Sequence, residues 1–170
     1  MRVLLDNGVD INTRDRDGRT GFHWACYQGS EAIVRILLDN GADVNRGDSR
    51  FAVFVSRLVP CNVRENIMST LLKYGADPNQ YSLDRDLLLH TALAMGMTNI
   101  VKLLLDHGAD VDIPSSKYEN ASSALESCDD PAERAACEAL LLEKSVERSS
   151  VPYLTWVNGI AYLNYTQQTS

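Results

Sequence analysis

Residues 37–45 read "LLDNGADVN", and close copies of this phrase return along the chain. The copies are "LLDNGVDIN" at 4–12, "LLKYGADPN" at 71–79 and "LLLDHGADVD" at 103–112. Each copy carries a glycine 33 or 34 residues after the previous one, and these glycines are Gly8, Gly41, Gly75 and Gly108. A fixed period of this size is typical of a repeat architecture, in which each unit stacks on the next.

The phrase predicts the end of a helix. The residues before two of the glycines, "EAIVRILLDN" at 31–40 and "NIVKLLLDH" at 99–107, carry apolar side chains at helical spacing. A glycine just past such a run can take the left-handed conformation that ends a helix, where a side chain would clash. Polar residues and a new helix start follow, so each unit is predicted to be a helix, a short link, a second helix and an extended turn.

The helix starts agree with this register, because His90 lies 67 residues after His23 and Gly108 lies 67 residues after Gly41. One start reads "GRTGFHWA" at 18–25, and its unit ends in "LLDNGADVN". This combination resembles the ankyrin repeat, whose pattern is G-x-T-P-L-H-x-A followed by L-L-x-x-G-A-D-V-N. The resemblance implies an all-α solenoid of stacked helix pairs with short hairpin-like turns, in which Thr20 caps a helix and His23 and His90 are structural ties between neighbouring turns.

The units differ in how well they keep the pattern. We assign a partial repeat to 1–14, good repeats to 15–47 and 82–114, and degenerate ones to 48–81 and 115–148. In the 48–81 unit the helix start is replaced by "RFAVFVSRLVPCNV", and in the 115–148 unit Ser145 stands where the terminating glycine belongs.

The tail at 149–170 allows two predictions. "LTWVNGIAYL" at 154–163 has the Asn-Gly pair that favours a two-residue hairpin turn. "NGIAYLNYTQQTS" at 158–170 also follows the spacing of a helix start, and we favour this degenerate fifth repeat, since the array provides the context. "IAYLNY" faintly resembles the box helix by which some ankyrin proteins recruit a ubiquitin ligase, although the expected upstream Leu/Cys-rich helix is not evident.

Composition narrows the functional classes. A net charge of −7 and a pI near 4.9 argue against sequence-independent nucleic-acid binding, which needs clustered cations. The sequence shows no apolar stretch near the ~18 residues of a membrane span. The cysteines lack paired spacing, so we expect reduced thiols in an intracellular protein, cytoplasmic or nuclear; they are Cys26, Cys61, Cys128 and Cys137.

A reactive site is not expected. His23 and Cys26 lie three residues apart in "RTGFHWACYQG" at 19–29, but a structural zinc needs four matched ligands and a cysteine nucleophile needs an oriented base. The carboxylate pairs fall at turns or helix starts, where the helix dipole favours them; they are Asp15/Asp17, Asp84/Asp86 and Asp129/Asp130. We therefore expect no enzyme activity, no metal, no cofactor and no small-molecule substrate.

What remains is surface. By resemblance, the partner would be another protein bound on the concave face, and the chain would act alone or as the scaffold piece of a larger protein. The matching positions are Arg16, Asp17, Arg19, Tyr27, Gln28, Leu83, Asp84, Asp86, Ala94 and Met95. Trp24 occupies a position that is usually a buried leucine, so we expect it in the core. Asn45 stands where an asparaginyl hydroxylase modifies similar animal repeats, and we keep that modification as a hypothesis.

Overall fold

The computed structural model describes residues 10–45, 60–81, 86–150, 153–157 and 160–164. Helices come in pairs within this part of the chain: α2 (Gly21–Tyr27) with α3 (Glu31–Asp39), α5 (Leu88–Ala94) with α6 (Thr98–Asp106), and α7 (Ala121–Leu125) with α8 (Pro131–Ser150). α4 (Cys61–Lys73) is a second helix, and most of the segment before it, 46–59, lies outside the described residues. Gly8 and most of the 1–14 segment lie outside them as well.

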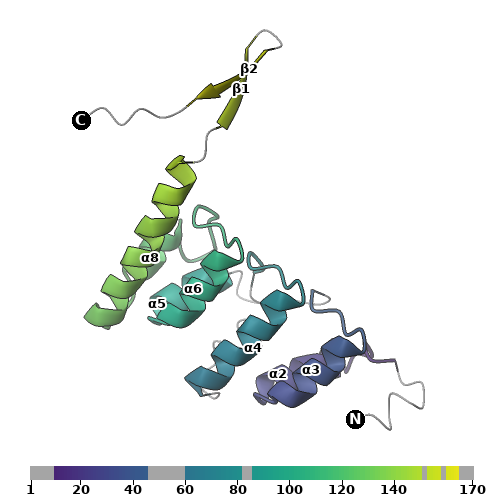
Figure 1. Ribbon diagram of the computed structural model, residues 1–170. Coiled ribbons are helices and arrows are strands. Elements are labelled where there is room, and N and C mark those ends of the chain that lie inside the picture. Colours follow the sequence, from purple (N-terminus) through teal and green to yellow (C-terminus); the bar gives the residue numbers. More distant parts are fainter. Residues whose placement is uncertain (1–9, 46–59, 82–85, 151–152, 158–159, 165–170) are drawn as a thin grey trace.

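The helices form two layers (Figure 1). In one layer α3, α4, α6 and α8 pack side by side in chain order, and in the other α5 packs against α7. Each first helix is joined to its second helix by a short link. This arrangement is the predicted all-α solenoid.

The second helices end as the repeated phrase predicts. Gly41 has a φ of 85°, in the left-handed region, and the next amide, that of Ala42, donates to the Leu37 carbonyl oxygen at 2.9 Å. This bond uses a carbonyl that the helix leaves without a partner at its end. Gly75 and Gly108 repeat both the conformation and the bond.

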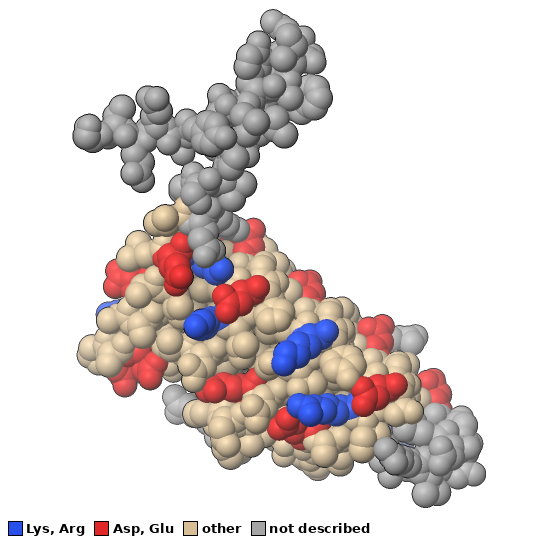
Figure 2. All heavy atoms as spheres, in the orientation of Figure 1, with Lys and Arg blue, Asp and Glu red and all other residues tan. Residues whose placement is uncertain are grey.

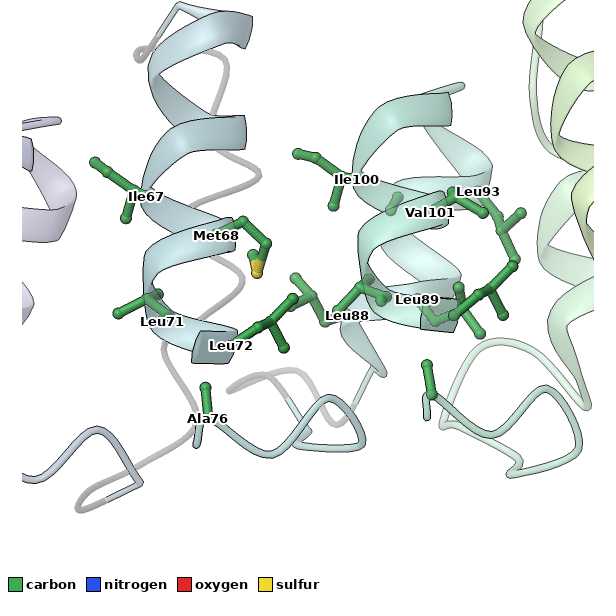
Figure 3. Packing of buried hydrophobic residues seen from close by; sticks show 14 of the residues in the cluster. Ile67, Met68, Leu71, Leu72, Ala76, Leu88, Leu89, Leu93, Ile100 and Val101 are labelled. Carbon is green, nitrogen blue, oxygen red and sulfur yellow. The ribbon is translucent and has the colours of Figure 1, made fainter. Parts of the chain in front are cut away.

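One core runs through the whole stack. At the same position of successive second helices lie Leu37, Leu71, Leu104 and Cys137, all at most 2% exposed. Figure 3 shows how the apolar side chains of α4 meet those of α5 and α6 across the gap between units. Burying one such leucine contributes roughly 2 kcal/mol, so each unit is stabilised by its neighbours.

A ladder of asparagine side chains joins the turns, and our sequence analysis missed it. Asn45 Oδ1 accepts from the Asp77 amide at 3.0 Å, and its Nδ2 donates to the Gly75 carbonyl oxygen at 2.8 Å. Asn79 repeats these bonds one unit later, to the Asp110 amide at 2.7 Å and the Gly108 carbonyl oxygen at 3.4 Å. The signal was present in the sequence as Asp-x-Asn at a constant distance from each glycine.

The 115–148 unit departs from the pattern in physical character as well as in sequence. Arg134 and Glu138 stand where the preceding unit has the buried Val101 and Leu105. The Arg134 Nε donates to the Leu125 carbonyl oxygen at 3.2 Å, at the end of α7. The face of α8 that continues the register therefore carries polar groups, and without a terminating glycine α8 continues to residue 150.

The tail forms the hairpin and not the fifth helix start that we favoured. Strands β1 (Tyr153–Val157) and β2 (Ile160–Asn164) pair antiparallel, with Tyr153 opposite Asn164 and Val157 opposite Ile160. The hairpin lies beyond the C-terminal end of α8 (Figure 1). β-Branched and aromatic residues on both sides of Asn-Gly favour strands, and this local preference prevails over the similarity to a helix start. Because 160–164 is a strand, "IAYLNY" does not form the helical box that ligase recruitment would require.

Candidate protein-binding surface

The turn before α2 is closed by one carboxylate. Asp15 Oδ1 accepts from the backbone amides of Asp17 at 2.9 Å and Arg19 at 2.8 Å, and the Asp15 amide donates to the Arg19 carbonyl oxygen at 2.7 Å. The Arg19 amide, together with the indole of Trp24, holds the pKa of Asp15 below its usual range. The carboxylate that we expected to be a turn residue is one, and it orders the backbone from which the next side chains project.

Trp24 lies on the surface beside this turn and not in the core as expected. Its Nε1 donates to Asp15 Oδ2 at 3.0 Å, and the Arg19 guanidinium lies over its ring, 5.1 Å from the centroid. The edge of Tyr27 meets the ring at a centroid distance of 5.9 Å and an interplanar angle of 80°. A tryptophan needs an acceptor for its indole N–H, and this one finds it at an exposed carboxylate.

We call Asp15, Arg19, Trp24 and Tyr27 the aromatic patch. Trp24 is 41% and Tyr27 43% exposed, although both rings are held in place by neighbours. The buried side of α2 consists of Phe22, Ala25 and Cys26. The patch is therefore an ordered apolar surface open to solvent, with a cation and a carboxylate at its edge.

The other expected contact residues are distributed over two units. Asp17 forms an ion pair with Arg19 at 3.3 Å, and Arg16 and Gln28 are exposed near the patch in sequence. In the 82–114 unit, Asp86, Ala94 and Met95 are half-buried, while Leu83 and Asp84 lie outside the described residues. Asp86 Oδ1 accepts from Ser116 Oγ at 3.2 Å, so it also joins its turn to the following one.

Met95 lines a groove on the side of the inter-helix links. With a volume of about 530 Å³, the groove runs between the start of α4, the α5–α6 link and the α7–α8 link. Its charged lining includes Arg64, Glu65 and Glu133. On the face of the molecule in Figure 2, cationic and anionic side chains are interspersed over the helical body.

Thr20 and His23 form the helix start that the family pattern implies. His23 Nδ1 accepts from the Thr20 amide at 3.0 Å and lies 2.8 Å from Thr20 Oγ1. Because Nδ1 accepts from an amide, it carries no proton, and the threonine hydroxyl donates to the same atom. His90 is fully buried in the corresponding position of α5.

The chemistry that a nucleophile needs is not favoured at Cys26. Burial raises the pKa of the Cys26 thiol, which keeps it protonated, whereas a reactive cysteine requires a thiolate. Among the described residues, His, Cys, Asp and Glu form no cluster of three or more suited to a metal ion. The described helices include none that is both long enough and apolar enough to span a membrane.

Comparison with known proteins connects this geometry to a family. A family model described as "Ankyrin repeats (3 copies)" matches residues 1–48, and one described as "Ankyrin repeat" matches residues 84–116. The chain is 25% identical over 160 residues to the NF-kappa-B inhibitor cactus of Drosophila yakuba, which covers 90% of this chain and 31% of that protein.

A second relative is a putative ankyrin repeat protein, FPV222, of Fowlpox virus (strain NVSL). It is 45% identical over 47 residues, which make up 28% of this chain and 6% of the viral protein. The chain thus spans less than a third of the length of either relative.

Proposed function

This chain belongs to the ankyrin-repeat family, and on that premise we propose that it is a non-catalytic protein-binding module whose partner docks on the aromatic patch. Ankyrin repeats generally mediate protein–protein interaction. A stack of units that share one core gives a rigid surface, so binding loses little free energy to ordering the module.

The observation that carries the proposal is the ordered exposure of Trp24 and Tyr27. Tryptophan, tyrosine and arginine are the residues most often found at the energetic centre of protein interfaces. Here all three types meet in one unit, and the hydrogen bond from Trp24 to Asp15 fixes the ring before any partner arrives. A partner would gain apolar contact without paying to immobilise the indole.

The acceptors and donors at the edge of the patch indicate how a partner would be oriented. Asp15 and Asp17 are exposed carboxylates, and Arg19 lies between them and the ring. A partner segment that places an apolar side chain on the rings and a polar group at this edge would meet both. Arg16, Gln28, Asp86 and Met95 would extend the same surface toward the neighbouring units.

The classes of ligand excluded by composition support a protein partner. A net charge of −7 does not suit a phosphate backbone. We expect no small-molecule substrate and no cofactor, and an intracellular location, cytoplasmic or nuclear. Cactus bears a name that makes it an inhibitor of another protein, NF-kappa-B, which agrees with partner binding as the general role; the identity of this chain's partner is a separate question.

The test is capture and cross-linking with matched variants. The tagged chain is incubated with an extract of its source cells and cross-linked, and the contacts of each captured protein are mapped by mass spectrometry. We expect cross-links in 15–29, and a Trp24→Ala/Tyr27→Ala variant should capture at least about tenfold less of the cross-linked partner, since two hot-spot residues are removed.

The matched control removes exposed apolar surface elsewhere. Leu142 and Val146 of α8 are 60% and 65% exposed, so Leu142→Ala/Val146→Ala leaves the patch intact. This control should capture the partner as the wild type does. Loss of the partner with the α8 variant, combined with retention by the patch variant, would refute the proposal.

Hydroxylation of Asn45 remains a separate hypothesis. Its side-chain amide is engaged at both ends, by the Asp77 amide and the Gly75 carbonyl oxygen, so a hydroxylase would have to open this turn first. A gain of one oxygen atom on the peptide containing Asn45, after incubation with an asparaginyl hydroxylase, would support it. An unchanged peptide mass would end it.

The module would serve equally as the recognition part of a larger scaffold. The matched segments are 31% and 6% of the two relatives, which places similar repeats within longer chains. In that case the same variants would disrupt the same contact, because the patch lies within one unit.

A further inference from the structure

His90 lies at the junction between the 82–114 unit and the 115–148 unit. Its ring is completely buried, and its Nδ1 lies 3.0 Å from Ser115 Oγ. The ring of Tyr118 meets it edge-on, with centroids 5.8 Å apart and an interplanar angle of 87°. The imidazole therefore touches the turn that leads into α7 through both a polar contact and a ring contact.

The turn that His90 touches is closed on itself. The Ser115 amide donates to the Tyr118 carbonyl oxygen at 2.8 Å, and the Tyr118 amide donates to Ser115 Oγ at 3.1 Å. Ser115 Oγ also lies within reach of the Tyr118 carbonyl oxygen, at 3.4 Å, to which its hydroxyl can donate. With that hydroxyl so directed, Ser115 Oγ is an acceptor for the N–H of a neutral His90.

The second ring nitrogen of His90 is in a different position. His90 Nε2 is buried and has no hydrogen-bond partner among the described residues. A neutral ring with its proton on Nδ1 leaves only a lone pair at Nε2. A protonated ring would place a charged N–H there without an acceptor, and an unpaired buried donor of this kind is strongly unfavourable.

The charged groups around His90 do not compensate for this. Neither α5 ("LLHTALA") nor α7 ("ASSAL") carries a charged residue, and Lys102 and Asp106 of the adjacent α6 are exposed. Asp86 attracts a proton toward the ring, while Lys117 lies over the Tyr118 ring at 5.0 Å. Burial is the larger effect, and it lowers the pKa of His90 despite Asp86.

We propose that His90 makes the junction between the 82–114 and 115–148 units sensitive to acid: protonation of the ring releases the 115–118 turn and loosens α7 from α5. The folded junction holds the neutral ring, whereas the opened chain binds a proton with the ordinary histidine pKa of 6.5. The stabilisation is complete above that pH and is lost progressively as the pH falls below it. This inference is independent of the partner-binding proposal.

The first test is amide hydrogen exchange of the intact chain at about pH 7.5 and about pH 5.5, with rates corrected for the intrinsic effect of pH. We expect protection of 115–125 to fall at least about tenfold at the lower pH, with α2 and α3 unchanged. In His90→Gln, which keeps a donor toward Ser115 but cannot take up a proton, the fall should be absent. The control is His107→Gln, because His107 is exposed, and it should behave as the wild type does.

The second test needs no substitution and guards against a His90→Gln chain that fails to fold. The ring of His90 is titrated by NMR in the wild-type protein. A midpoint below 6.5, reached together with loss of the α7 signals, supports the proposal. A midpoint at or above 6.5 with α7 intact, or an identical pH response in His90→Gln and wild type, overturns it.

Discussion

The 15–47 and 82–114 units share a register but use it differently. The histidines correspond, yet His23 is half-buried and accepts from Thr20 in its own helix start, while His90 is fully buried and contacts the following unit. Trp24 and Tyr27, both exposed, correspond to Thr91 and Ala94, both half-buried. One unit therefore offers an ordered surface, and the other is built mainly to hold its neighbours together.

This difference shows how a repeat divides its labour. The positions that make the core and end the helices are alike in both units, since stacking demands them. The positions that face solvent are free to differ, and in the 15–47 unit they carry aromatic side chains. Binding and stability should therefore respond to substitutions in different units, and the following variants test that separation.

The largest effect should come from the core of the 82–114 unit. Leu93 and Cys26 occupy equivalent positions and are at most 2% exposed. Leu93→Ala removes a large buried group and should lower the free energy of unfolding by about 3 kcal/mol, whereas Cys26→Ala should cost about 1 kcal/mol. Urea denaturation measures both. Equal losses would mean that the two units are packed alike, contrary to our comparison.

The asparagine ladder should come next. Asn45→Ala removes two hydrogen bonds between neighbouring turns and should lower the free energy of unfolding by about 2 kcal/mol. Asn62→Ala, an exposed position in α4, is the control and should change it by less than about 0.5 kcal/mol. Thermal and urea unfolding give the values, and a neutral Asn45→Ala would remove the ladder from the account.

The helix start of the 15–47 unit should give a smaller loss. Thr20→Ala removes the hydroxyl beside His23 Nδ1 and should cost about 1 kcal/mol, as helix-cap losses usually do. His23→Ala should likewise lower the melting temperature. An increase in stability from either variant would contradict a structural role for this pair.

The smallest effects separate two glycines by their backbone. Gly41 has a φ of 85° and no atom within 4 Å of an added Cβ, so Gly41→Ala is strained by conformation alone and should cost about 1 kcal/mol. Gly21 is helical and also has free space, so Gly21→Ala should stabilise the protein by about 0.5 kcal/mol. The same sign for both would show that φ does not decide the outcome.

The sequence allowed much of the fold to be predicted, because the period and the glycines are local signals repeated many times. The caps, the helix pairs and the buried leucines follow from them. The tail was wrong, since similarity to a helix start said less than the strand preference around Asn-Gly. The site was predicted in part: Arg19 and Tyr27 were chosen, but Trp24 was assigned to the core.

Trp24 was missed for a physical reason. A single position does not reveal whether an indole will be buried or tied to a surface carboxylate nine residues earlier, as it is to Asp15. Likewise, nothing in the position of His90 indicated that its Nε2 would be left without a partner, because this depends on the turn of the next unit.

The most direct test of the central claim is the dissociation constant of the captured partner, measured by calorimetry with single variants at equivalent positions. We predict that Trp24→Ala weakens binding by at least about tenfold, while Thr91→Ala changes it by less than about twofold, because only Trp24 belongs to the aromatic patch. Thermal unfolding of both variants should verify that the fold is kept. An unchanged affinity in Trp24→Ala, with the fold intact, would contradict the account.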